Sequence, residues 1–205
     1  MKSYLFIPNI ATFCVSMLFL FSCNAQDNKS NQQTPAPKIE EVKRIDNMKA
    51  TSIAGMAFTN LMAVEQIEKY SSSCGSENYQ QPDEYYAVTF QQKGSPYFIA
   101  HLLTDGKIIY MQKLYPALPP QTIKLDKIAA EKIAEDLVYY KLQARKGQYK
   151  VTKTEQEKVN KGIDAYWIVT LDKDPEINKN KRVPNSLVVK IHPKTHEVMV
   201  LEYKY

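Results

Sequence analysis

One segment of helix length followed by three segments of strand length occurs twice along this chain of 205 residues, and this order constrains the fold most strongly. In residues 48–120, a helix is predicted over 48–70 and strands over 85–92, 97–104 and 107–113. In residues 121–205, a helix is predicted over 125–142, a weak extra strand over 149–155, and strands over 165–172, 186–192 and 197–203. Strands joined by short hairpins pair antiparallel. We therefore predict an α+β domain over 48–205, an antiparallel sheet with helices packed on one face and two candidate half-repeats of a helix plus three strands.

Hydrophobic periodicity supports both helices. The apolar residues of each fall on one stripe: Ile53, Met56, Ala57, Leu61, Val64 and Ile67 in the first, and Leu125, Ile128, Ala129, Ile133, Leu137 and Tyr140 in the second. Asp105-Gly106 is typical of a hairpin turn, because glycine readily adopts positive φ. The polar stretch over 71–83 has no alternating apolar residues, and it predicts a loop.

The N-terminus carries a short apolar run that ends on a cysteine. Ile10 to Phe21 is about 12 residues long, whereas a membrane-spanning helix needs roughly 20. The residues Leu20-Phe21-Ser22-Cys23 resemble a bacterial lipobox, with Phe21 bulkier than usual. The resemblance implies that residues 1–22 are a signal peptide, and that the thiol of Cys23 receives a diacylglycerol. The alternative is a plain secretory signal cut after Ala25.

Residues 23–47 read as a lipidated cysteine followed by a flexible tether. This segment is rich in Asn, Gln, Lys and Ser, and it has no aromatic residue, so it cannot bury enough apolar surface to fold. Asp27 is the one acid close to the cysteine, which favours the periplasmic side of the outer membrane over surface exposure. We expect the chain to contact the membrane through its lipid anchor.

Composition excludes several classes of function. The net charge of +5 is spread along the chain, and in an exported protein it does not indicate nucleic-acid binding. Cys14 lies in the signal peptide and Cys74 is the remaining thiol, so no internal disulfide is expected. The six glycines form no phosphate-binding loop, and no cysteine pair or His-Glu motif suits a metal. We predict no cofactor, no metal and no enzymatic activity.

Three histidines and one cysteine are the candidate reactive groups. His101 lies on the same strand face as Ile99 and Leu103, either as a core histidine or lining a cavity between helix and sheet. His192 and His196 flank a turn, which places them in a solvated hairpin. Cys74 lies in the predicted polar loop, where nothing lowers the pKa of a thiol. Asp172, Asp174 and Glu176 lack the glycine and the closing glutamate of a calcium loop, and they predict a solvated loop.

Two features suggest contacts with a partner protein. Tyr166 and Trp167 place one ring on each face of a strand, and an exposed aromatic ring is a common anchor in interfaces. Lys179, Lys181 and Arg182 form the densest basic stretch, between two strong strands. Such a loop can meet an acidic partner and steer association.

The last 85 or so residues resemble two known families. The segments "LDKIAAEKIAE", "AYWIVTLD" and "SLVVKIHPKTHEVMVLEYK" resemble PepSY-type modules and small immunity proteins with a nuclear-transport-factor-2-like fold. Trp167 and Val169 match the aromatic strand of these families, whereas His196 replaces the glycine of their final turn. The resemblance implies binding and inhibition of other proteins, with no shared catalytic set.

These features together predict a lipid-anchored periplasmic module that binds a protein, of immunity or inhibitor type, and acts by steric occlusion. Trp167 and the basic residues Lys179, Lys181 and Arg182 are its candidate contacts. One alternative is a carrier with a small-ligand cavity between helix and sheet near His101. A further alternative is a hydrolase-like enzyme that uses His101 as a base.

Overall fold

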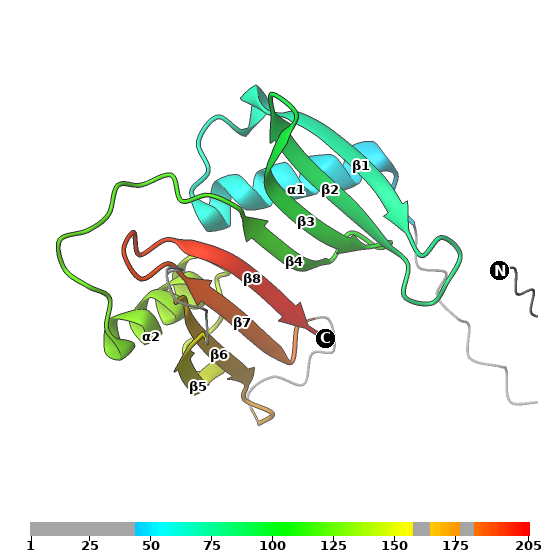
Figure 1. Cartoon of the computed structure of the whole chain (residues 1–205). Coiled ribbons are helices and arrows are strands. Elements are labelled where there is room, and N and C mark those ends of the chain that lie inside the picture. Colours follow the sequence, from blue (N-terminus) through cyan, green and yellow to red (C-terminus); the bar gives the residue numbers. More distant parts are fainter. Residues whose placement is uncertain (1–43, 158–164, 177–182) are drawn as a thin grey trace, which may run out of the picture. The chain divides into compact units, whose positions relative to one another are not determined.

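Each half of the folded chain consists of one helix followed by four strands (Figure 1). The computed structural model describes residues 44–157, 165–176 and 183–205, which belong to the compact unit Glu41–Tyr205. The first half holds α1 (Asn47–Met62), the 3-10 turn η1 (Ile67–Lys69), β1 (Ser71–Glu77), β2 (Tyr85–Gln92), β3 (Ser95–Leu103) and β4 (Ile108–Lys113). The second half holds α2 (Lys127–Asp136), the π-helical turn η2 (Leu137–Lys141), β5 (Tyr149–Gln156), β6 (Trp167–Lys173), β7 (Ser186–Ile191) and β8 (Val198–Lys204).

All eight of these strands form one antiparallel sheet in the order β1-β2-β3-β4-β8-β7-β6-β5. The last strand of each half lies at the centre, where Met111 of β4 pairs with Leu201 of β8. The two halves therefore meet through equivalent strands, and β1 and β5 form the outer edges. This arrangement confirms the predicted α+β fold with an antiparallel sheet.

One row of side chains shows how the core is built across the sheet. Cross-strand partners in this row are Cys74, Val88, Ala100, Met111, Leu201, Val189, Val169 and Thr154, from β1 to β5. Most of them belong to a single hydrophobic cluster together with buried residues of α1 and α2. Helix α1 packs against β1, β2 and β3, and α2 packs against β5 and β6. Both helices thus cover the same face of the sheet, as predicted.

Side-chain caps begin both helices. Asp46 accepts a hydrogen bond from Lys49 N at 2.7 Å, and Asp126 accepts one from Ala129 N at 2.8 Å. Both caps satisfy backbone N–H groups that have no partner within the helix. Helix α1 ends at Met62, well before the predicted end at residue 70, and the C-cap residue Ala63 has φ 52°. The folded part also begins earlier than predicted, because Ile45 packs against the core and donates to Thr104 O at 2.9 Å.

The prediction of a loop over residues 71–83 is wrong in its first half. Ser71–Glu77 forms β1, so the first half has four strands where three were predicted. Most residues of β1 are exposed, so the strand carries none of the alternating apolar residues that mark a half-buried strand. Its regular pairing with β2 holds it in place. The weak strand predicted over 149–155 is confirmed as β5.

The predicted apolar stripes are also partly wrong. Met56 is 54% exposed, Ile128 is 77% exposed and Tyr140 is 78% exposed. Helix α2 instead turns Ala130 and Ala134 to the sheet, and both are fully buried. Alanine adds little hydrophobic signal to a periodicity, but its small side chain lets a helix lie close to a sheet. No helix among the described residues is long and apolar enough to cross a membrane.

Candidate functional site

The connection between the two halves, residues 114–126, is bonded along its length to the β7–β8 hairpin. Gln121 N donates to Lys194 O at 2.6 Å, and Leu125 N donates to Pro193 O at 3.3 Å. These bonds satisfy backbone groups that would otherwise need water. These bonds hold the connection against the β7–β8 hairpin.

A buried ion pair next to the connection 114–126 joins the two halves. Lys113 Nζ lies 2.6 Å from Glu197 Oε1, and the two side chains are 3% and 6% exposed. Lys113 Nζ also donates to Met62 O at 3.2 Å, and Glu197 Oε2 accepts from Leu118 N at 3.0 Å. A buried ion pair is tolerated when such additional hydrogen bonds satisfy both charges.

The electrostatics of Glu197 follow from these contacts. Burial raises the pKa of its carboxyl, but the ammonium of Lys113 and the backbone N–H of Leu118 outweigh burial. The resulting pKa lies below the ordinary value for glutamate, so Glu197 stays ionised. The pair links β4, the connection 114–126 and the start of β8.

An apolar groove opens above this pair, with a volume of about 540 Å³. Its walls come from the end of α1, the connection 114–126, the α2–η2 segment and the β7–β8 hairpin. Lining residues include Leu61, Ala117, Ile133, Leu137 and Val198. We call this cavity the groove. Its volume lies in the range of roughly 300–1,000 Å³ that is typical of ligand-binding clefts.

Two exposed apolar side chains stand at the mouth of the groove. Tyr140 is 78% exposed and Leu118 is 54% exposed. The π-helical turn explains the position of Tyr140, because the bond from Leu142 N to Leu137 O, at 3.0 Å, adds a residue to the last turn of the helix. Such π turns frequently occur at functional sites.

Acidic side chains at the groove are available to a partner. Glu65 and Asp136 line the groove and are exposed, and neither forms an ion pair within the part of the chain that the structure describes. Lys141, which lines the groove from the same α2–η2 segment as Asp136, donates to Leu61 O at 3.4 Å. The groove therefore combines apolar walls, a saturated polar floor and two unpaired carboxylates near its mouth.

His101 lies elsewhere, on the sheet face away from the helices. Its neighbours Ala100 and Leu102 are fully buried, so His101 points to the opposite side. Its ring lies between the rings of Tyr85 and Tyr110, with centroids at 4.7 and 5.2 Å. The expected cavity between helix and sheet near His101 is wrong: the residue lines an open depression with Glu202 and Tyr205 instead. Burial lowers the pKa of His101, despite an opposing effect of Glu77.

Trp167 packs against the core cluster on the helix side of the sheet. Its Nε1 donates to Leu125 O at 3.1 Å, which ties β6 to the residue just before α2. The other candidate residues, Cys23, Lys179, Lys181 and Arg182, lie outside the described residues and stay predictions.

The remaining polar candidates have structural partners. The Nδ1 atom of His192 accepts from Thr195 N at 3.1 Å, and the ring of His196 contacts Ile123 O at 2.9 Å. His196 has φ 60°, a left-handed conformation that glycine adopts more readily than other residues. Asp174 pairs with Lys150 at 2.6 Å. Burial raises the pKa of the Cys74 thiol, and no metal-binding cluster of three acidic, histidine or cysteine side chains occurs in residues 44–157, 165–176 and 183–205.

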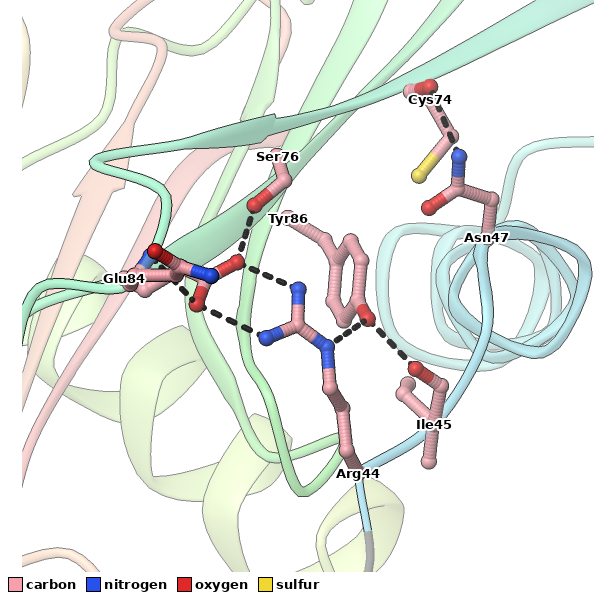
Figure 2. Close-up of polar contacts among 8 residues, drawn as sticks. Arg44, Ile45, Asn47, Cys74, Ser76, Glu84 and Tyr86 are labelled. Carbon is pink, nitrogen blue, oxygen red and sulfur yellow. Dashed lines mark hydrogen bonds and ion pairs between the residues drawn. The ribbon is translucent and has the colours of Figure 1, made fainter.

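A second polar network fixes the N-terminal end of the described chain. Figure 2 shows Arg44 bound to both oxygens of Glu84, at 2.9 and 2.5 Å, while Ser76 donates to the same carboxylate. Arg44 Nε also donates to Tyr86 OH at 3.2 Å, and Tyr86 donates to Ile45 O at 2.5 Å. This network fastens the segment before α1 to β1 and β2.

This network is expected to affect how the free energy of unfolding changes at acidic pH. The hydrogen bonds from Arg44 and Ser76 lower the pKa of Glu84 to about 2, from an ordinary value of 4.5. Because the folded-state pKa is depressed, the contribution of Glu84 is present above pH 4.5 and is lost as the pH falls toward 2. We expect Glu84→Gln to flatten the fall in unfolding free energy over that window, measured by urea unfolding at several pH values. An unchanged acid limb in this variant would contradict the role of the network.

Comparison with known proteins agrees with the fold. No protein-family model and no curated protein matches the chain. Among solved structures, the chain is similar to the Bacillus megaterium YpeB C-terminal domain, with 12% sequence identity and a TM-score of 0.56. The similarity covers 79% of this chain and 64% of that chain, so this chain matches less than two thirds of its neighbour's length. It shows a PepSY-like fold, one of the two resemblances predicted from the C-terminal residues.

Proposed function

We propose that this chain is a protein-binding module of inhibitor or immunity type, and that its partner docks at the groove. The observation that carries the proposal is the position of Tyr140 and Leu118, two large exposed apolar side chains at the mouth of an apolar cavity. Exposed aromatic residues beside a pocket are typical anchors of protein interfaces.

The polar groups of the groove suggest the chemistry of the partner. Lys113 and Glu197 are satisfied by each other and by backbone groups, so the floor has little to offer a polar ligand. Glu65 and Asp136 can meet a basic residue. A protein segment that inserts an apolar side chain and places a lysine or arginine near the mouth fits this arrangement. Its bulk would then block the partner's own binding surface.

The cellular context of this proposal comes from the sequence. Lipidation of Cys23 would hold the module at the periplasmic side of the outer membrane, and the segment before Arg44 would act as its tether. The basic residues Lys179, Lys181 and Arg182 remain candidates for a second contact with the same partner.

Capture of the partner from gently solubilised membranes tests the proposal. We expect Tyr140→Asp to weaken recovery of a stoichiometric partner by at least about tenfold, because a carboxylate at the mouth opposes apolar docking. Ile128→Asp is the matched control, since Ile128 is equally exposed on the same helix but does not line the groove. Equal recovery with both variants, measured by quantitative mass spectrometry, would exclude the groove as the docking site.

A small-ligand carrier remains the second candidate, and the volume of the groove favours it. In that case the ligand is apolar and occupies the groove itself, away from His101. Native mass spectrometry of protein purified from its own cells separates the two functions. A bound small molecule that Tyr140→Asp displaces would favour the carrier, and a protein partner without such a molecule would favour the inhibitor.

A further inference from the structure

The two outer edges of the sheet differ in how they are protected. Strand β5 carries Lys150 and Lys153, and its register with β6 shifts between Val151 and Lys153. Lysines and bulges on an edge strand discourage pairing with another strand. Strand β1, with the sequence SSSCGSE, has neither lysine nor proline, and it pairs with β2 over seven residues without a shift in register. The β1 edge is therefore open to strand addition.

The backbone groups of β1 that face outward can be assigned from the sheet register. Leu103 and Tyr97 direct their backbone groups to the β4 side, where Leu103 N donates to Lys107 O and Tyr97 O accepts from Leu114 N. Alternation across β2 then directs the N–H and C=O groups of Ser72, Cys74 and Ser76 away from the sheet. Asn47 Nδ2 donates a hydrogen bond to the Cys74 carbonyl (Figure 2). The two atoms are 3.5 Å apart, so the bond is long.

We propose that β1 pairs antiparallel with β1 of a second copy of this chain, about a two-fold axis at Cys74. This register places Cys74 opposite its own counterpart, Ser73 opposite Gly75, and Ser71 opposite Glu77. No like charges meet in it, so the strand is complementary to itself. Two copies joined in this way form one continuous sheet across the interface.

The surroundings of β1 favour this occupant over an unrelated strand. A Cβ atom built on Gly75 would meet no atom of the described residues within 4 Å, so a side chain can be added at this position without a clash in that part of the chain. Met48 comes one residue after Asn47 in the first turn of α1, and it is 84% exposed. The two-fold axis brings the N-terminal part of α1, which contacts β1 through Asn47, near the same part of the second copy. Such a two-fold interface closes on itself, and the lysines of β5 prevent further growth.

The dimer is tested by introducing lysines that would face each other across the two β1 strands. In the double variant Ser73→Lys/Gly75→Lys, each new side chain faces its like-charged counterpart across the axis, whereas within one copy the neighbours are the neutral Thr89 and Ala87. We expect the full chain, kept in detergent solution, to sediment as a dimer. The double variant is expected to sediment as a monomer, with dimerisation weakened at least about tenfold.

A charge-swapped partner keeps the test specific. Ser73→Glu/Gly75→Glu is expected to be monomeric alone and to form a heterodimer when mixed with the lysine variant. Thr152→Lys/Gln156→Lys adds the same charge to the β5 edge and is expected to leave the dimer intact. In hydrogen exchange, the amides of Ser72, Cys74 and Ser76 are expected to become protected as concentration rises. A wild-type full chain that stays monomeric at millimolar concentration, or a dimer that survives the lysine variant, would overturn the proposal.

Discussion

Replacement of Lys113 by methionine is expected to destabilise the protein by about 3–5 kcal/mol, because it leaves the carboxylate of Glu197 buried without its counter-charge. The side chain of Glu197 is only 6% exposed, so water cannot replace the lost ammonium. For a domain of this size, the expected fall in Tm is roughly 6–20 °C. Denaturant unfolding followed by circular dichroism measures both quantities.

The double variant Lys113→Met/Glu197→Gln is the control for this prediction. It removes both charges, and the glutamine oxygen can still accept from Leu118 N, so most of the lost stability is expected to return. Because the folded-state pKa of Glu197 lies below its ordinary value, wild-type stability falls on acidification, and the double variant is expected to lose that component. If Lys113→Met were as stable as the double variant, the ion pair would have no structural role.

Replacement of Trp167 by alanine is expected to cost about 3 kcal/mol, near the lower end of values for large aromatic residues in cores. The indole packs against the core cluster and bonds to Leu125 O, so its loss frees the start of α2 from β6. Trp167→Phe keeps most of the packing and loses the hydrogen bond, for which about 1 kcal/mol is expected. Urea unfolding of the two variants separates packing from hydrogen bonding.

This experiment also decides between two roles for Trp167. Tyr140→Ala is the matched control, because Tyr140 is 78% exposed and its removal is expected to change stability by no more than about 0.5 kcal/mol. A partner contact at Trp167 would appear as lost binding in Trp167→Phe at nearly unchanged stability. A Trp167→Ala variant as stable as wild type would contradict the structural role.

The groove shows why its residues were hard to predict. Lys113 lies two positions after Met111, so alternation along β4 places both side chains on the buried face. This alternation is the local sequence pattern that predicts a buried lysine here. Its partner Glu197 lies 84 residues away in the sequence, and no local pattern connects the two. Periodicity places Tyr140 on the buried stripe of the second helix, but a π-helical turn directs it to the mouth of the groove.

The sequence by itself determined the elements whose signals are local. Alternating apolar residues, the Asp105-Gly106 turn and the amphipathic segments were enough for the antiparallel sheet and for both helices on one face. Exposed β1 has no apolar alternation, and only its pairing with β2 makes it a strand. The tertiary structure also decided that the halves join through β4 and β8, which creates the groove and leaves β1 at an edge. Strand order, buried ion pairs and cavities depend on residues that are distant in the chain, whereas periodicity reports only on neighbours.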